Sequence, residues 1–368
     1  MKAVWYTKTG KAKDVLQIGE QDNPVPIAGE VLVRVRASGI NPSDVKIRAG
    51  ARGPLQFPTV IPHSDGSGEI IDVGEGVDKS RIGEKVWIWN AAFGRAHGTC
   101  AEFITLPDLQ AVKVNDNVSY KSAACIGIPA STAYYGIYSN GSVKNKTVLV
   151  SGGAGAVGFY GIQLAKLAGA NVITTISNDE KANIASSAGA DKIINYKTED
   201  VVEEVMEYTD NNGVDRIFEV EFGGNLPINE KIINSNGVIV TYGSMAEMEP
   251  RLPFYNLMFK GIKIDTFLIY SIEEAFRKEI LSGLSELLNQ ESLKHMISKI
   301  YSIDDVVDAH NAMESSSIIG NIVIEIWNRT GGVYKFDAQK TLPVLNLRLI
   351  KKNTKLEISL MGVNYGKF

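Results

Sequence analysis

A glycine-rich turn between a short apolar run and an amphipathic segment constrains the fold of this chain more than any other feature. Val148–Val150 predicts the end of a buried strand, and residues 159–167 have the composition and apolar spacing of a helix. Between them, Gly153, Gly155 and Gly158 satisfy the G-x-G-x-x-G pattern in its strand–turn–helix context. Such a turn lets the backbone approach a pyrophosphate and directs a helix N-terminus at its negative charge. The sequence therefore predicts dinucleotide binding, with a purely structural glycine turn as the alternative.

The residues that follow this turn bear on which nucleotide binds. A second strand, predicted over residues 171–176, ends at Ser177, whereas an NAD-preferring site usually places Asp or Glu there to bond the ribose 2′-hydroxyl. Lys181 can reach back as a cation, with a solvated helix residue as the alternative reading. We therefore expect NADPH rather than NADH. The turn residues expected to contact it are Gly152, Gly153, Ala154, Gly155, Ala156, Val157 and Gly158.

Length and composition are those of an ordinary globular enzyme. The chain has 368 residues, enough for two domains, with 44% hydrophobic and 22% charged residues. Its two cysteines, Cys100 and Cys125, allow neither a disulfide framework nor a four-cysteine metal site. The first residues lack a signal-peptide pattern, and no apolar run approaches the ~20 residues of a membrane span. We expect a cytoplasmic protein.

The pattern of apolar residues changes near residue 125. Before it, short alternating runs at 31–37, 69–73 and 85–89 predict an antiparallel, β-rich domain. From about residue 130 to 265, strands alternate with helices, as in a doubly wound parallel sheet. The strands expected there are 147–150, 171–176, 192–195, 216–219 and 238–242. Helices are expected at 272–290 and 304–313, and a closing strand at 322–326.

Several motifs together resemble one branch of a known family. They are Gly39–Asp44, Ile47–Gly50, Pro62–Gly68, Ala124–Pro129, Thr132–Tyr134 and Tyr242–Ser244, in addition to the glycine turn. Over residues 1–327 the chain resembles the zinc-independent quinone oxidoreductase (zeta-crystallin) branch of the medium-chain dehydrogenases/reductases. The resemblance implies an α/β protein, in which a GroES-like catalytic domain and a Rossmann domain enclose an active site.

The resemblance also implies domain limits and a partner. We expect a GroES-like domain over residues 1–126, a Rossmann domain over 127–268, and a return to the first domain over 269–327. The branch is typically dimeric or tetrameric, so residues 261–267 are expected to be an edge strand that pairs with a second copy. An exposed apolar edge otherwise invites aggregation.

Zinc is not expected. In zinc-dependent members of this family a cysteine ligand stands where this chain has Asn41, and a His–Glu pair stands where it has Ser64–Asp65. His63 lies one place before the ligand position and is expected to be a polar cleft or surface residue. His97, His295 and His310 are scattered along the sequence, and we expect them to be solvated.

Without a metal, positioning and polarisation by the protein must activate a carbonyl, which suits quinones and conjugated enones. Asn41 is the first candidate donor, with a turn residue before proline as the alternative. Asp44 either holds Asn41 or caps a helix. Thr132 would lie under the nicotinamide, with a buried helix threonine as the alternative. The substrate side of the cleft is expected to include Lys46, Arg48 and Ser64. A tyrosine is common at position 46 in the branch, so this chain loses an aromatic wall and gains a cation, either in the cleft or in solvent.

Three further residues extend the nucleotide site by resemblance. Tyr196, fifteen places after Lys181, matches a tyrosine that contacts the adenosine phosphate in bacterial members, with a surface-strand aromatic as the alternative. Gly243 and Ser244 complete the expected cofactor contacts. A lysine common before the last strand is Asn321 here, so one positive contribution is missing.

The last segment departs from the family. Residues 328–368 carry eight Lys/Arg and two Asp/Glu, a local net charge of +6, so residues 1–327 carry −10 of the total of −4. A basic arm could touch nucleic acid, and an added segment with poor order is the alternative. Leu342–Ile350 is apolar enough to form a strand. The function predicted is an NADPH-dependent quinone or enone reductase, with a non-catalytic NADPH-binding protein, crystallin-like or RNA-binding, as the alternative.

Overall fold

The computed structural model describes residues 1–315 and 319–326 of the chain. Within these ranges it contains a six-stranded sheet, a seven-stranded sheet and a small antiparallel pair, β1 (Lys2–Trp5) with β2 (Gln17–Glu20). The basic segment 328–368 and the apolar stretch Leu342–Ile350 lie outside the described residues. No helix in the described ranges has both the length and the apolarity to cross a membrane.

The six-stranded sheet is parallel and contains the strands predicted from the alternating pattern. In spatial order they are β10 (Lys192–Asn195), β9 (Asn171–Ile176), β8 (Thr147–Val150), β11 (Val214–Glu219), β12 (Ile233–Thr241) and β13 (Lys263–Thr266). The chain winds outward from β8 in both directions, so the strand order reverses between β8 and β11. Ligands of doubly wound sheets bind at the carboxyl ends of the strands at such a reversal.

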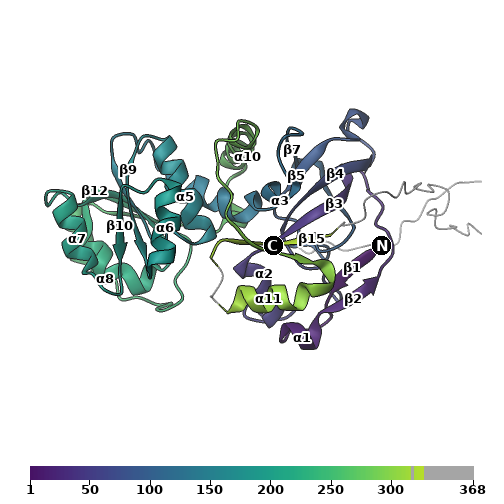
Figure 1. Ribbon diagram of the computed structural model, residues 1–368, viewed down its shortest axis with the longest axis horizontal. Coiled ribbons are helices and arrows are strands. Elements are labelled where there is room, and N and C mark those ends of the chain that lie inside the picture. The colour runs from purple at the N-terminus through teal and green to yellow at the C-terminus, as the bar shows by residue number, and fades with distance from the viewer. Residues whose placement is uncertain (316–318, 327–368) are drawn as a thin grey trace, which may run out of the picture. The chain divides into compact units, whose positions relative to one another are not determined.

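Helices cover both faces of this sheet, and the alternation of side chains along β8 shows why. Val148 and Val150 join the apolar cluster that includes α5, whereas Leu149, pointing the other way, joins the cluster that includes α7 and α8. Figure 1 shows α5 and α6 on one side of the strands and α7 and α8 on the other. The helices of this part are α4 (Ser131–Tyr138), α5 (Ala156–Leu167), α6 (Asp179–Ala188), α7 (Val201–Tyr208), α8 (Phe222–Ile232), α9 (Phe254–Lys260) and α10 (Glu274–Asn289).

The seven-stranded sheet is mixed and has the order β14-β15-β3-β4-β5-β7, with β6 paired to β3. Its strands are β3 (Glu30–Ile40), β4 (Asp65–Val73), β5 (Lys85–Ile88), β6 (Phe103–Pro107), β7 (Ala111–Lys113), β14 (Ile297–Ser302) and β15 (Asn321–Glu325). The accompanying helices are α1 (Ala12–Val15), α2 (Pro42–Ala49), α3 (Tyr120–Ala123) and α11 (Val306–Glu314).

The end of the described chain returns to this first sheet. β15 lies antiparallel to β3, with Ile322 opposite Ile40. Helix α10 packs into the same apolar cluster as α4 and α5 and also contacts the mixed sheet, where Trp87 of β5 donates to Ser285. β14 is the first strand of this last segment to join that sheet. The domain limits remain predictions.

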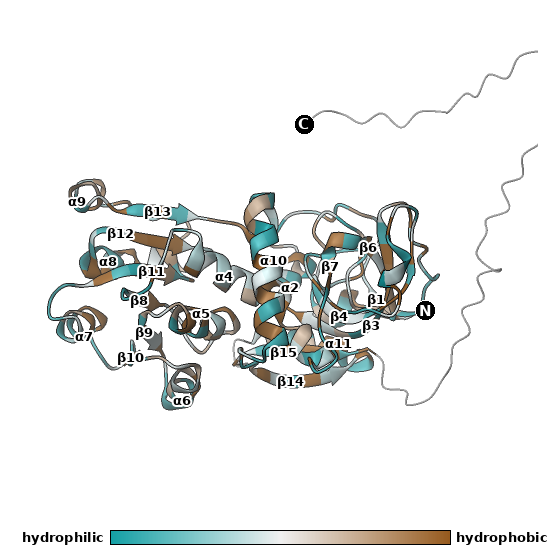
Figure 2. Ribbon diagram, turned by 90° about the horizontal axis from the view of Figure 1, so that it is seen from above, coloured by the Kyte–Doolittle hydropathy of each residue, from teal (hydrophilic) through white to brown (hydrophobic). Residues whose placement is uncertain are grey.

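The edge strand expected at 261–267 is present. β13 pairs with β12 on one side, and on its other side no strand of the described residues lies against it. Figure 2 shows β13 and α9 together along the outer edge of the parallel sheet.

Candidate functional site

A cavity of about 490 Å³ opens between helix α2 and the glycine turn. It also touches the start of α4 and the loops that follow β11, β12 and β13. Two hydrogen bonds join its walls: Tyr270 donates its hydroxyl to Ser43 Oγ at 2.7 Å, and Lys46 Nζ donates to Met245 Sδ at 3.4 Å. The predicted site residues that line it are Asn41, Lys46, Thr132, Gly152, Gly155, Ala156, Val157, Gly158, Gly243 and Ser244.

The glycine turn has the geometry of a phosphate cradle. Gly152 has a φ of 69°, which favours glycine, and a β-carbon at Gly158 would collide with the Gly152 carbonyl oxygen. Gly155 is the N-cap residue of α5, so the first N–H groups of this helix are directed toward the cavity side of the turn. Gly153 and Ala154 are not among the cavity residues. A β-carbon at Gly153 would collide with the Thr174 hydroxyl, so this glycine allows close packing of the turn onto β9.

The predicted donor Asn41 is held on both sides. It is the N-cap of α2, and its backbone N–H donates to Asp44 Oδ2 at 2.8 Å in a capping box. Its side-chain Nδ2 donates to Asp65 Oδ2, also at 2.8 Å. Asp44 therefore both holds Asn41 and caps the first turn of the helix, which are the two roles expected for it. Asp44 is not among the cavity residues, so it positions Asn41 and does not face a ligand.

Asp65 is the hub of this arrangement. The same Oδ2 also accepts the backbone N–H of Ile128 at 2.8 Å, and Oδ1 is buried without a hydrogen-bond partner. Burial, opposed by these hydrogen bonds and reinforced by the charge of Asp44, raises the pKa of Asp65 to about 8. Burial likewise raises the pKa of Asp44 to about 7, against hydrogen bonds from Asn41 and Ser64 that lower it.

Thr132 lies on α4 and faces the same cavity. Its hydroxyl donates to the Ile128 carbonyl at 2.7 Å, and the residue is 3% exposed. It is thus both a buried helix threonine and a cavity residue. Because its proton is already donated, the hydroxyl can only accept from a ligand in this rotamer.

Two family models match the chain in the order of its two sheets. One, described as an alcohol dehydrogenase GroES-like domain, matches residues 27–116; the other, described as a zinc-binding dehydrogenase, matches residues 156–286. Together they match more than half of the chain. The chain belongs to the medium-chain dehydrogenase/reductase family. In this family's terms, the mixed sheet is the GroES-like part and the parallel sheet is the Rossmann-type part.

The relatives of this dehydrogenase/reductase agree with that membership. A quinone oxidoreductase of Homo sapiens is 27% identical over 305 residues, which is 82% of this chain and 90% of that protein. A zinc-type alcohol dehydrogenase-like protein of Schizosaccharomyces pombe is 28% identical over 88% of this chain and 96% of its own length. The structure of a mycobacterial protein complexed with NADPH is 27% identical, with a TM-score of 0.77, over 89% of this chain and 100% of that chain.

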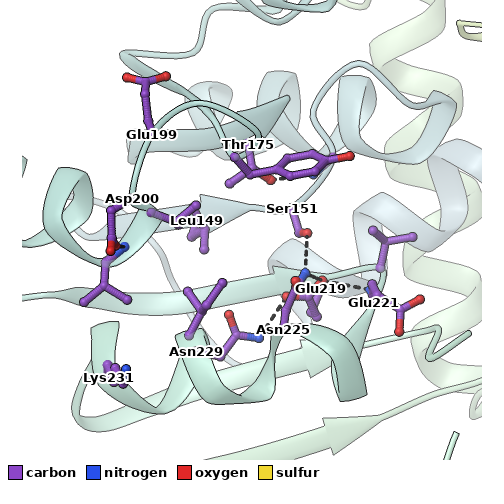
Figure 3. Close-up of a pocket in the computed structure, with 16 residues that line it drawn as sticks. Leu149, Ser151, Thr175, Glu199, Asp200, Glu219, Glu221, Asn225, Asn229 and Lys231 are labelled. Carbon is purple, nitrogen blue, oxygen red and sulfur yellow. Dashed lines mark hydrogen bonds between the residues drawn. The ribbon is translucent and has the colours of Figure 1, made fainter. Parts of the chain in front are cut away.

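A second cavity, of about 550 Å³, lies at the carboxyl ends of β8, β9 and β11 and shares Gly152 with the first (Figure 3). Tyr196 lines it and is 52% exposed, and its N–H donates to the Ile176 carbonyl at the end of β9. Ser177 follows Ile176 directly, and its hydroxyl accepts from Lys181 Nζ at 2.9 Å. The structure therefore brings together the three residues predicted to recognise the adenosine phosphate, although Ser177 and Lys181 are not among the residues that line this cavity.

Carboxylates also line this second cavity, and hydrogen bonds hold the innermost one. Glu219 is fully buried and accepts from Asn229 at 2.8 Å, from Asn225 at 3.0 Å and from the Glu221 N–H at 2.8 Å. Figure 3 shows Asn225 linking Glu219 to Ser151. This network closes the floor of the cavity beside the strand-order reversal.

Two of the three residues expected on the substrate side lie elsewhere. Arg48 is fully buried and is not among the cavity residues; its guanidinium donates to the Gly10 carbonyl and to Glu314 Oε1. Ser64 is 2% exposed and lines a neighbouring cavity, where it donates to Asp44. Lys46 alone of the three lines the main cavity.

The histidine predictions were wrong for three residues. His63 is completely buried, with Nδ1 at 2.8 Å from Ser38 Oγ and Nε2 at 3.0 Å from Nε2 of His310, which is also fully buried. Burial lowers the pKa of both rings, that of His310 to about 3. His295 is partly buried and lies 2.9 Å from the Tyr160 hydroxyl. In the described part of the chain, no three His, Cys, Asp or Glu side chains are grouped so as to hold a metal ion.

Sequence reasoning missed several residues that the structure places in or beside the cavity. Arg52 and Tyr270 line it, and Asp65 positions Asn41. The sequence gives a signal for Asp65, which lies within the Pro62–Gly68 motif, but none for Tyr270, which is more than two hundred residues from the serine it contacts.

The buried Asp65 carboxyl predicts a pH dependence of stability. Because its pKa is raised in the folded state, folding retains a proton that the unfolded chain loses near pH 4, so this stabilisation declines between about pH 4 and pH 8. Asp65→Asn keeps an acceptor for Asn41 and Ile128 but carries no charge. Its free energy of unfolding relative to the wild type should increase by about 1 kcal/mol per pH unit across that window, measured by urea denaturation.

Asp72→Asn, on the same strand and only partly buried, is the matched control and should follow the wild-type pH profile. Parallel profiles for Asp65→Asn and the wild type would show that Asp65 is ionised throughout.

Proposed function

We propose that the chain reduces quinones or conjugated enones with NADPH, in the cavity between α2 and the glycine turn, without a metal ion. The observation that carries this proposal is the single cavity that joins the phosphate cradle to Asn41 and Thr132. The human relative's name, quinone oxidoreductase, supports the substrate class, and the mycobacterial complex supports the cofactor.

The residues present suit a reaction that needs positioning more than acid catalysis. Reduction of a quinone takes one hydride from the reduced nicotinamide and one proton from solvent, and gives the hydroquinone and the oxidised cofactor. Asn41 Nδ2 has a second hydrogen besides the one that it donates to Asp65, and we infer that it bonds the acceptor's carbonyl oxygen. Conjugation spreads the developing charge, so one neutral donor suffices where a simple ketone would need a metal.

The zinc-ligand positions support metal-free chemistry. Asn41, Ser64 and Asp65 occupy them; the Asn41 amide nitrogen is a poor ligand, and Asp65 already accepts two hydrogen bonds. His63, one place earlier, turns away into the buried contact with His310.

The function is tested by following NADPH oxidation in the presence of quinones, 2-alkenals and simple ketones. We expect turnover with the first two classes, in protein that holds no stoichiometric zinc by elemental analysis and that keeps its activity after chelator treatment. One equivalent of tightly bound zinc would contradict the metal-free proposal. NADPH binding with no turnover of any acceptor would favour the non-catalytic alternative.

NADPH selection is assigned to Ser177, Lys181 and Tyr196. Ser177 leaves the end of β9 without the carboxylate that would repel a 2′-phosphate, and Lys181 Nζ lies 2.9 Å from its hydroxyl. A phosphate in this place would accept from both groups, with Tyr196 beside them at the end of β9.

Lys181→Ala should therefore weaken NADPH binding by about tenfold and leave NADH binding unchanged, because a charge-assisted hydrogen bond contributes about 1.5–3 kcal/mol. Equilibrium titration of both cofactors measures this. The matched control is Lys146→Ala, because Lys146 is exposed and lies at the end of β8 opposite the glycine turn. An equal loss for both cofactors would show that Lys181 does not recognise the phosphate.

We also propose that two copies of the chain pair through the β13 edge. Beside this edge, helix α9 exposes Phe254 (64%), Tyr255 (67%) and Phe259 (79%). The Tyr255 ring stacks on Phe259 and meets Phe254 edge to face. Such an apolar group next to an unpaired strand edge suits a self-complementary interface.

Phe259→Glu should convert the oligomer to a monomer in size-exclusion chromatography with light scattering, because it buries a charge in the interface. Leu109→Glu is the control, since Leu109 is similarly exposed (64%) but lies in the GroES-like part. A monomeric wild-type protein, or an oligomer that Phe259→Glu leaves intact, would exclude this interface.

A further inference from the structure

We propose that Lys46 and Arg52 form an anion-binding subsite that selects acceptors bearing a carboxylate at the end distant from the reacting carbonyl. This inference rests on the proposed function, because it names the substrate class of the same cavity.

The cavity does not end at α2. A neighbouring cavity of about 230 Å³ continues from it, and the two share Ser43, Arg52, Leu268 and Tyr270. None of the glycine-turn residues lines this extension, so it lies on the side away from the cofactor cradle. An acceptor whose carbonyl lies beside Asn41 can therefore extend past Tyr270 into it.

The walls of the extension suit a flat, conjugated molecule. Phe93 stacks on Tyr270 with a centroid distance of 4.9 Å and an angle of 12° between the rings. Phe93 is 48% exposed and lines the extension, so part of its ring surface is accessible to a ligand. Aromatic pairs of this kind accept a further ring by offset stacking.

The charged side chains that line the two cavities are all positive. Lys46 and Arg52 line the main cavity, Arg52 and Arg95 line the extension, and no Asp or Glu is among the described residues that line either. Arg95 is compensated by Glu30 at 3.4 Å. Residues 1–327 carry a net charge of −10, so the positive charge at the two cavities does not follow from the overall composition.

The two remaining cations lack anionic partners. Lys46 Nζ donates to Met245 Sδ, a weak acceptor, and it forms no ion pair with the described residues. Arg52 is exposed and forms neither a hydrogen bond nor an ion pair within the described ranges. A ligand carboxylate would supply the missing partner, and it would displace only a thioether and water.

Neither cation is needed for the cofactor's phosphates. The pyrophosphate is assigned to the glycine turn and the 2′-phosphate to Ser177 and Lys181, both on the Rossmann-type part. Lys46 and Arg52 belong instead to α2 and the turn after it, on the GroES-like wall of the cavity. Their ligand is therefore the acceptor.

The test compares two naphthoquinones that differ only at the end of a saturated side chain, one a free carboxylate and the other its methyl ester. The spacer gives both the same reduction potential. At saturating NADPH and low salt, the wild type should show a kcat/KM about tenfold higher for the acid, and added salt should reduce this ratio. In the double variant Lys46→Gln, Arg52→Gln the ratio should approach one.

Lys278→Gln is the control for loss of a single positive charge. Lys278 is an exposed residue of α10 paired with Glu274 and is not among the residues that line either cavity, and this variant should keep the wild-type ratio. Reduction of both quinones by the wild type without preference for the acid would overturn the subsite and leave the proposed function standing.

A binding measurement separates the two proposals if no quinone is reduced. A naphthalene with the same carboxylate side chain cannot accept a hydride, and its affinity for the NADPH-saturated protein is compared with that of its methyl ester. Tighter binding of the acid by the wild type, lost in the double variant, would retain the subsite while the reductase function fails. Equal binding of acid and ester would overturn the subsite.

Discussion

The candidate site depends on one buried carboxyl group. Asp65 begins β4, and its Oδ2 accepts from Asn41 at the start of α2 and from the backbone of Ile128 ahead of α4. Ile128 in turn accepts the Thr132 hydroxyl. Two walls of the cavity, one from the GroES-like part and one from the segment entering the Rossmann-type part, are therefore held to a single oxygen atom.

This hub restricts the residues around it. Gly127 can be nothing larger, because a β-carbon there would collide with the Asp65 carboxyl group. The segment Ile126–Ala130 forms a π-helical turn, which presents the Ile128 N–H to Asp65 and its carbonyl to Thr132. Such local departures from α-helical geometry are frequent at functional sites. The raised pKa of Asp65 is the cost of placing a carboxyl where it can bond both walls yet meet no cation.

The sequence predicted those parts of the fold whose causes are local. The glycine turn, the alternating strands of the parallel sheet and the amphipathic helix α10 each depend on neighbours in the chain, and they lie where the pattern indicated. β12 begins five residues before the expected strand, because Ile233 pairs with Val214 across a bulge, although the residues between, Asn234 to Gly237, show no strand pattern.

The sequence predicted the site less completely than the fold, because the wrong predictions concern side chains whose contacts are distant in the sequence. Arg48 lies on the same helix as Lys46, yet its guanidinium turns inward because Glu314, 266 residues away, provides an acceptor. His63 is buried because Ser38 and His310 satisfy both ring nitrogens. Glu314 and His310 cannot be identified as these partners from one sequence, because both lie on α11 and come close only when this helix packs on the mixed sheet.

The contact between Lys46 and Met245 joins the two parts of the protein beside the candidate site. Lys46 is only partly buried, and none of the described carboxylates forms an ion pair with it. Here the loop after β12 offers a thioether, which contacts the ammonium group without neutralising it. The Rossmann-type part thereby meets the GroES-like part through a weak contact beside Asn41. The loop can release the lysine at little cost when a better acceptor enters, so the same contact that closes the cavity leaves its charge available to a ligand.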